Sequence, residues 1–322
     1  MVQIKKFKAT DEEFIEIAKI RNLVNHDCVD HPDEDKNDWE IRDKSKIRNR
    51  LLLYDNKKLI GLLYYTQGRG ENNQTSFFNI LINPKYNNNG FREMLYQEML
   101  NEVKYFECNQ LYSNVYEHSN YKTYHRFLIK HNFKLVQTNR EYSCNIRQIN
   151  TKEYQPLIKK LESEGIKFYD SKSQMLGWPN HYKKLEKLHW ILDQDIPHPD
   201  GIKPTRLPFT QWKKVILDFY NNSYGVDIVA VKNGDYIGAT DIEIFPKSEP
   251  HKGWTGGLGV IREFRRRGIA TVLKIKAIEA LLKKGITEIR TDNEENNPMY
   301  KINEALGFKP VPFSLEYMKK LV

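Results

Sequence analysis

One order of strands, turns and helices occurs twice in the chain, at an offset of about 177 residues, and this repeat constrains the fold more than any other feature. The register holds at Gly61 and Gly238 (offset 177), Gly90 and Gly268 (178), and Phe133 and Phe308 (175). An apolar stripe at helical spacing follows each turn glycine: Phe91, Met94, Leu95, Met99 and Val103 in the first copy, and Ile269, Val272, Leu273, Ala277 and Leu281 in the second. The sequence therefore predicts two similar domains, residues 1–147 and residues 148–322.

Apolar periodicity predicts a mixed α/β domain in each half. The first half has a predicted strand over 4–9, a helix capped by Thr10 or Asp11, and strands near 50–54, 59–67, 75–82 and 111–116. The second half has predicted strands over 227–231, 236–245, 257–261 and 286–291. The acidic segment 25–43 is interpreted as a loop or lid, residues 151–192 as rich in helix, and 247–253 as a loop.

Composition limits the classes of partner. The 322 residues carry a net charge of +9, which suits a polyanion, but the basic residues are spread along the chain without an aromatic-interleaved patch. Nucleic acid is therefore disfavoured, and attraction to a small phosphorylated molecule is favoured. The distant Cys28, Cys108 and Cys144 predict neither disulfides nor a zinc site. No apolar run reaches transmembrane length and no signal peptide is recognisable, so we expect a cytoplasmic protein without membrane contact.

The stretch 260–270 is a strand that runs into a basic, glycine-bearing turn at the start of a helix. Gly268 allows the backbone to approach a ligand closely, Ala270 keeps the helix start unobstructed, and Arg265 to Arg267 add positive charge. Free N–H groups at the positive end of a helix favour a phosphate. The same residues also fit a basic surface turn that merely contains glycine. On the helix that follows, Lys274 lies largely off the apolar stripe, on the predicted polar face.

A second pattern lies near the C-terminal end of the second half. A predicted strand over 286–291 leads into the polar turn 293–297, and Pro298 suits a first helical turn. A short apolar stripe follows, formed by Met299, Ile302 and Leu306. Gly307 provides a left-handed helix cap before Phe308, which opens the last strand.

With both motifs, the sequence resembles the GNAT superfamily of N-acetyltransferases, and specifically its tandem, two-domain members, which are similar to mycothiol synthase-like proteins. The matching residues are Val260, Arg265, Gly268 and Ala270 in the first motif, and Asn296, Met299, Ile302, Leu306, Gly307 and Phe308 in the second. The resemblance is strongest over 230–310 and weaker over 51–136. It implies an α/β fold of two tandem GNAT-like domains, each with a mixed, mostly antiparallel twisted sheet, flanking helices and a splayed acyl-CoA cleft.

The resemblance also implies acetyl-CoA as co-substrate, without a metal, in the cleft between the strand ending at Val260 and the strand 286–291. Backbone groups of the first strand would bind the acetyl carbonyl and pantetheine, and the turn and helix start would bind the pyrophosphate. The implied contact residues are Leu258, Gly259, Val260, Arg265, Arg266, Arg267, Gly268, Ile269, Ala270, Thr271, Asn296, Met299 and Asn303.

The catalytic residues depart from the family pattern. Many members have a tyrosine that protonates the leaving thiolate where this chain has Asn303, which cannot act as an acid at neutral pH. Tyr300 on the same helix is a possible substitute, although a packed aromatic is the simpler interpretation. For the general base, Glu243 is the first choice, with Asp241 and His251 as alternatives. Solvated charges at the sheet edge explain these carboxylates equally well.

The first half has lost the motif residues. Its turn has Asn87 in place of the leading arginine and Arg92 in place of the small residue, and Leu128 is equivalent to Asn303. We expect this half to be structural and to help form the acceptor site. The predicted function is N-acetyltransfer to a primary amine, with a small molecule favoured, by a monomer or homodimer. The alternatives are a non-catalytic acyl-CoA sensor and, third, a nucleic-acid-binding protein.

Overall fold

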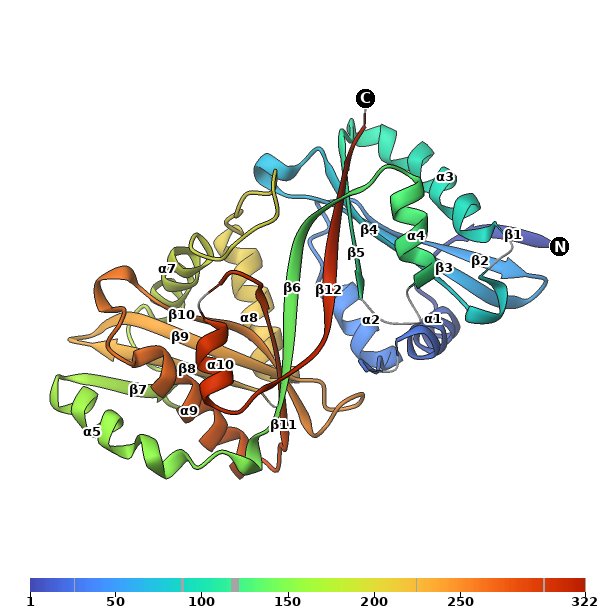
Figure 1. The fold of residues 1–322 in the computed structure, drawn as a ribbon. Helices are drawn as coiled ribbons and strands as arrows, with labels where there is room; N and C mark the ends of the chain where they lie inside the picture. The colour runs from blue at the N-terminus through green and yellow to red at the C-terminus, as the bar shows by residue number, and fades with distance from the viewer. Residues whose placement is uncertain (26, 88–89, 117–121, 224, 298, 322) are drawn as a thin grey trace. The chain divides into compact units, whose positions relative to one another are not determined.

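A computed structural model describes residues 1–25, 27–87, 90–116, 122–223, 225–297 and 299–321 (Figure 1). The chain forms two compact units. The first contains Met1–Asn139, His198–Thr205 and Pro312–Val322, and the second contains Arg140–Pro197 and Arg206–Val311. Each unit therefore includes residues from both halves of the sequence. The division of the sequence into domains at residue 147 stays a prediction.

The sheet of the first unit has the strand order β1-β2-β3-β4-β5-β12. Neighbouring strands are antiparallel except β4 and β5, which are parallel. The strands are β1 (Val2–Lys6), β2 (Arg48–Asp55), β3 (Lys58–Gln67), β4 (Thr75–Ile82), β5 (Gln110–Tyr116) and β12 (Lys309–Lys320). Residues Ser314–Lys320 of β12 pair along the whole length of β5 and so cover its edge.

Four helices accompany this sheet, α1 (Asp11–Val24), α2 (Pro32–Ile41), α3 (Phe91–Val103) and α4 (Lys122–Lys130). The helix predicted after Thr10 is confirmed, and Thr10 and Glu13 form its capping box. The interpretation of residues 25–43 as a loop is wrong, because α2 lies there. His31 caps its first turn, Pro32 occupies the first position, and three acidic residues follow at the positive end of the helix.

The sheet of the second unit has the order β6-β11-β10-β9-β8-β7. Only β10 and β11 are parallel among the neighbours from β11 to β7 whose register is described. The strands are β6 (Lys134–Asn145), β7 (Ile166–Asp170), β8 (Val226–Lys232), β9 (Asp235–Ile244), β10 (Lys252–Val260) and β11 (Glu288–Glu294). The prediction that residues 151–192 are rich in helix is confirmed, although the short strand β7 lies among these helices. The predicted loop 247–253 needs correction, since β10 begins inside it.

Helices cover both faces of the second sheet (Figure 1). One face packs on α9, and the opposite face packs on α7 and α8 through Leu185, Leu188, Ile216 and Tyr220. The helices of this unit are α5 (Gln155–Ser163), α6 (Ser171–Gln174), α7 (His181–Asp193), α8 (Phe209–Asn222), α9 (Ile269–Lys283) and α10 (Tyr300–Ala305). Side chains of β9 alternate between the faces, so Asp241 and Glu243 lie opposite Ile242 and Ile244.

The repeat seen in the sequence is present in the backbone. Thr75 of β4 pairs with Gln110 of β5, and their counterparts Lys252 and Glu288 pair in β10 and β11. Gly90 and Gly268 have φ of 71° and 85° and precede α3 and α9, respectively. The mixed α/β class, with helices flanking mostly antiparallel sheets, is confirmed.

Candidate active site

The parallel strands β10 and β11 part after three paired residues. Lys252, Gly253 and Trp254 pair with β11, and both strands then continue without pairing to one another, as far as Val260 and Glu294. A register shift at Gly256, a β-bulge, bends β10 where the two strands separate. The backbone groups of β10 that face β11 beyond Trp254 therefore have no strand partner on that side, and they can bind an extended ligand.

The turn beyond β10 has a backbone conformation suited to binding an anion. Gly268 adopts a left-handed conformation, and Arg266 does the same with φ of 62°. The first helical hydrogen bond of α9 runs from Val272 N to Gly268 O at 3.1 Å. The N–H groups of Ile269 to Thr271 precede this bond and project from the positive end of the helix. The side chain of Ile269 is buried in the core.

The arginines of this turn differ in what they contact. Arg265 Nε donates to Val260 O at 2.8 Å, and its guanidinium pairs with Asp195, which also binds Arg262. Arg267 pairs with Glu164. Arg266 is exposed and, within the described part of the chain, makes no hydrogen bond or ion pair with another side chain. Arg265 and Arg267 thus hold the turn in place, and Arg266 is available for a ligand.

Residues of the second motif lie on or next to α10. Asn296 is exposed, and its Nδ2 donates to Glu294 Oε1 at 2.9 Å. Met299 and Tyr300 are partly buried, and Tyr300 packs against the core. Asn303 is buried with 3% of its surface exposed, and its Nδ2 donates to Asn293 Oδ1 at 2.9 Å. Residue 298, also part of the predicted motif, lies outside the described residues.

Lys274 is the largest correction to the predicted site. Its predicted place on the polar face is wrong, because only 1% of this residue is exposed. The apolar stripe of α9 is wider than the periodicity suggested, because the helix also packs on α5 and is buried nearly all round. Lys274 Nζ donates to Asn303 Oδ1. Burial lowers the pKa of Lys274 to about 7.

Two carboxylates face each other across β8 and β9, on the side of the sheet opposite α9. Asp227 pairs in register with Asp241, and a Cβ built on Gly256 would lie 1.9 Å from Asp241 Oδ2. The Asp241 carboxylate therefore lies directly over the bulge where β10 leaves β11. Burial, together with the smaller effect of the nearby charges of Asp227 and Glu243, raises the pKa of Asp241 to about 7.

Asp227, which the sequence patterns do not single out, is fully buried and joins a hydrogen-bond network. Tyr220 donates to Asp227 Oδ2 at 2.7 Å, the Tyr220 and Ser171 hydroxyls lie 2.5 Å apart, and Ser171 Oγ lies 3.1 Å from His181 Nε2. Among the described residues, Asp227 Oδ1 has no hydrogen-bond partner. Burial raises the pKa of Asp227 to about 6. A charged residue at the start of an otherwise apolar strand is the signal that points to it.

The equivalent parting of strands in the first unit is blocked. β4 and β5 also separate after three paired residues, but Asn79 Nδ2 donates to Asn114 Oδ1 across the gap. Arg92 is 9% exposed, and its guanidinium lies 5.3 Å from the centre of the Tyr124 ring. It also donates to Asn87 Oδ1 at 3.2 Å. Of the predicted degenerate turn, residues 88–89 lie outside the described residues.

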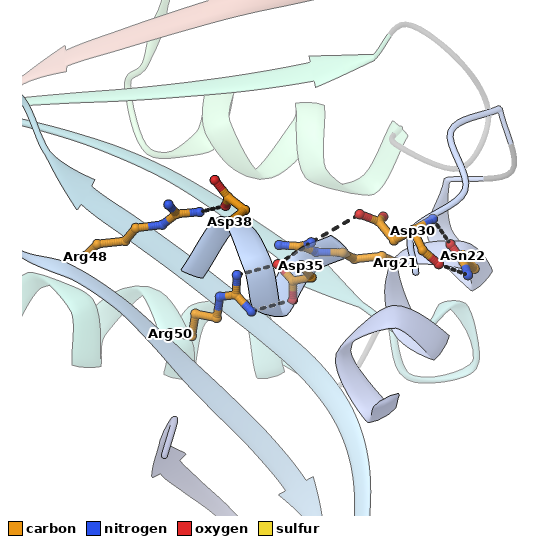
Figure 2. A network of polar contacts seen from close by, with 7 residues as sticks. All are labelled: Arg21, Asn22, Asp30, Asp35, Asp38, Arg48 and Arg50. Carbon is orange, nitrogen blue, oxygen red and sulfur yellow. Dashed lines mark hydrogen bonds and ion pairs between the residues drawn. The ribbon is translucent and has the colours of Figure 1, made fainter. Parts of the chain in front are cut away.

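In the first unit, the sheet face equivalent to the one that carries Asp227 and Asp241 has an arginine whose charge is paired with an aspartate. Figure 2 shows Arg50 and Arg21 converging on Asp35, with Asp30 on the far side of Arg21 and a separate pair of Arg48 and Asp38. The two Arg50–Asp35 hydrogen bonds are both 2.6 Å long. Three aromatic rings enclose the Arg50 guanidinium: Phe7, Phe14 and Trp39. This arrangement is a closed ion-pair cluster.

Two other kinds of feature are absent from the described residues. No group of three or more His, Cys, Asp or Glu side chains is placed to hold a metal ion there. Within the same described part of the chain, no helix combines the length and apolar character needed to cross a membrane.

Comparison with known proteins agrees with this geometry. Residues 185–308 match the family model described as Acetyltransferase (GNAT) family. No curated protein sequence matched the chain. Among solved structures, a tandem GNAT protein from the clavulanic acid biosynthesis pathway, without AcCoA, superposes with a TM-score of 0.79 at 14% identity, covering 99% of this chain and 98% of that one. A GCN5-related N-acetyltransferase from Sphaerobacter thermophilus gives 0.68 at 16% identity, covering 98% and 95%.

The parted strands and the glycine turn both lie within residues 185–308, the range that matches the GNAT acetyltransferase family model. Over almost its full length, the chain has the fold of a tandem GNAT protein. The predicted fold class and family are thus confirmed, and the similarity to mycothiol synthase-like proteins stays a prediction.

Proposed function

We propose that the protein is an acetyl-CoA-dependent N-acetyltransferase whose second unit acetylates a cationic primary amine. The observation that carries the proposal is the open parting of β10 and β11, bordered by the Gly268 turn and by the Asp241 carboxylate. The turn suits the phosphates of a coenzyme, and the unpaired β10 edge suits its extended pantetheine arm. The carboxylate suits an ammonium group. All the predicted contact residues from Leu258 to Thr271 belong to this part of the second unit.

Acetyl-CoA, when bound, would supply the activated acetyl group. The free N–H groups of Ile269 to Thr271 and the exposed Arg266 would hold its pyrophosphate. Backbone groups of Leu258, Gly259 and Val260 would position the pantetheine and polarise the acetyl carbonyl. Asn296 and Met299, which lie next to α10, would contact the pantetheine arm. Gly259 permits close packing there, because a Cβ on this residue would lie 2.9 Å from Leu192 of α7.

Asp241 is the side chain best suited to receive a proton from the amine. A general base works best when its pKa lies near the working pH, and burial places the pKa of Asp241 at about 7. Asp241 also has no cationic partner within the described residues, so an incoming ammonium would be its counter-ion. Glu243, two residues along the same face, would orient the amine. The buried charge of Asp227 would favour a cation at this site over a neutral nucleophile.

The proposal is tested by following thiol release from acetyl-CoA by the purified full-length protein over a panel of amines. The panel contains monoamines, diamines, amino sugars and lysine peptides, with the corresponding alcohols as controls. Acetyl-CoA binding is measured in parallel by calorimetry. Turnover with an amine, and none with the matched alcohol, supports the proposal. Tight binding without turnover on any amine would favour the acyl-CoA sensor, and absence of binding would exclude both functions.

A further inference from the structure

Lys274 lies in the core without a carboxylate partner. Its amino group is 4.4 Å from the centre of the Phe308 ring, and its hydrogen-bond acceptor is the neutral amide of Asn303. Among the described titratable groups, only the Cys144 thiol of β6 interacts electrostatically with Lys274. Burying a lysine in this way costs stability, because the ammonium loses its hydration and gains no opposite charge. Packing alone therefore does not explain why a lysine occupies this position.

The lysine fixes the orientation of the Asn303 amide. A lysine ammonium can only donate hydrogen bonds, so the Asn303 atom that faces it must be Oδ1. The Nδ2 group is then turned toward Asn293, to which it donates one of its two hydrogens. Asn293 lies on β11 three residues beyond Arg290, the last residue that pairs with β10. The amide N–H group is therefore presented toward the part of β11 that has separated from β10.

The first unit shows that the fold does not require these two polar residues. Tyr96 occupies the position of Lys274, six residues after the turn glycine, and is 1% exposed. Leu128 occupies the position of Asn303 and is fully buried. In both units the residue at this position accepts a hydrogen bond from the phenylalanine five residues later, at 3.0 Å. An aromatic and an aliphatic side chain thus fill the same space in the first unit, whereas an amine and an amide bond one another in the second.

We propose that Asn303, held and polarised by Lys274, binds the sulfur of the thiolate that leaves when acetyl-CoA is cleaved. The proposal rests on the proposed function. When the amine nitrogen bonds to the acetyl carbon, the carbon–sulfur bond breaks and the sulfur keeps its electron pair. The free Nδ2–H of Asn303 donates to this sulfur. The amine loses its protons through Asp241 to solvent, and the thiolate takes a proton from solvent after release.

Lys274 acts through Asn303 and is a positioning residue. An ammonium bonded to the amide oxygen draws electron density from the amide and strengthens its N–H donors. With a pKa of about 7, Lys274 is about half protonated at pH 7, and a thiolate on the far side of the amide would favour its protonated form, because the Lys274 and Asn303 side chains are both buried. A hydrogen-bond donor and a buried cation would therefore replace the proton donor that position 303 lacks.

The test measures the pKa of the CoA thiol bound to the protein, by titrating the near-ultraviolet absorbance of its thiolate. We compare the full-length protein with Lys274→Met, with Asn303→Leu, which copies the first unit, and with Lys276→Met as a matched control on the same helix. Lys276 is partly exposed and pairs with Glu279. The wild type and Lys276→Met should ionise the bound thiol at least about tenfold more readily than free CoA. Lys274→Met and Asn303→Leu should abolish this difference.

A bound thiol with the same pKa in the wild type and in Lys274→Met would overturn this inference alone. Failure of the wild type to bind CoA would overturn the proposed function as well. Thermal denaturation provides a second test, in which Lys274→Met is expected to gain stability although it loses the effect on the bound thiol. The unfolded chain binds a proton at Lys274 between pH 10.5 and about 7 that the folded chain lacks. Lys274→Met should therefore melt at a higher temperature than the wild type near pH 7, with a gain that disappears toward pH 10.5. A melting temperature that falls at every pH would show that the lysine serves packing.

Discussion

The two units share a backbone and differ in the charges that they bury on it. Arg50 pairs with Tyr64 in β2 and β3, and Asp227 pairs with Asp241 at the equivalent positions of β8 and β9. In the first unit the Arg50 charge at this position has an opposite partner, since Asp35 binds both Arg50 and Arg21. In the second unit, neither Asp227 nor Asp241 has a cationic partner in the described part of the chain. The first arrangement suits stability, and the second suits a cation that arrives from outside.

The same contrast holds where the parallel strands part. In the first unit the Asn79 side chain hydrogen-bonds across the gap between β4 and β5. At the equivalent position of β10 in the second unit, the bulge residue Gly256 has no side chain. At the helix start, the buried Arg92 is replaced by Ala270. Features that both units share are therefore those that the fold requires, and features found only in the second unit are those that the site requires. The turn glycines and strand registers occur in both units, whereas, among the described residues of these two regions, the parting without a bridging side chain and the buried carboxylates without a cationic partner occur in the second.

The largest effect is expected at the turn glycines. Glutamate at position 268 places a side chain and a negative charge where the phosphates would bind, so Gly268→Glu should weaken acetyl-CoA binding by at least about 100-fold. Gly90→Glu is the matched control, because Gly90 has the same left-handed conformation and caps the equivalent helix. Calorimetry on both variants, with melting curves to verify folding, measures the difference. Equal losses in the two variants would break the contrast between the units.

The next effect concerns the base. Asp241→Asn should lower kcat/KM by about 100- to 1,000-fold, and Glu243→Gln by less than about tenfold. Because the carboxylate must be ionised to take a proton, wild-type activity should fall as the pH drops below about 7, the pKa of Asp241. Rates measured from pH 5 to pH 9 test both points. A larger loss from Glu243→Gln would assign the proton transfer to Glu243.

A smaller effect comes from transferring the first unit's arginine to the second. Ala270→Arg reproduces the arrangement at Arg92 and should crowd the helix start, which would weaken acetyl-CoA binding by about 10- to 100-fold. The reciprocal Arg92→Ala should leave the affinity unchanged. If Ala270→Arg binds acetyl-CoA as tightly as the wild type, Arg92 does not explain why the first unit is blocked.

The smallest effect is a shift of the pH profile. Asp227→Asn removes a negative charge that raises the pKa of Asp241, although burial contributes more. The acid limb of the profile should therefore move to lower pH by less than about one unit, so that relative activity at pH 6 increases. An unchanged limb would mean that the two carboxylates are not coupled during catalysis.

The sequence predicts the parts of the site that depend on local backbone chemistry. A glycine before an apolar stripe predicts the turn at 268, where φ is indeed positive, and Thr10 as a helix cap predicts the start of α1. The strand that carries Asp241 and Glu243 on one face follows from the alternation of β9.

What could not be predicted depends on tertiary contacts. Helix α2 is acidic and weakly apolar, and its place in the fold depends on Asp35, which binds an arginine 15 residues away. Lys274 looks like a surface lysine until Asn303 of α10, Phe308 and Cys144 of β6 cover that side of α9. Asp227 gains its significance only from its cross-strand neighbour. Helical spacing cannot reveal how many sides of a helix will be covered.

The pairing of β12 with β5 also bears on how the protein can be made. β5 ends at Tyr116, and the partner residues Ser314–Lys320 are synthesised only after all residues of the second unit. Until then β5 has an exposed, unpaired edge, which is the feature of a nascent sheet most prone to wrong association. The first unit therefore cannot complete its sheet during its own synthesis. A fragment that stops before β12 should be retained by chaperones or aggregate, even though nearly all of its core residues are present.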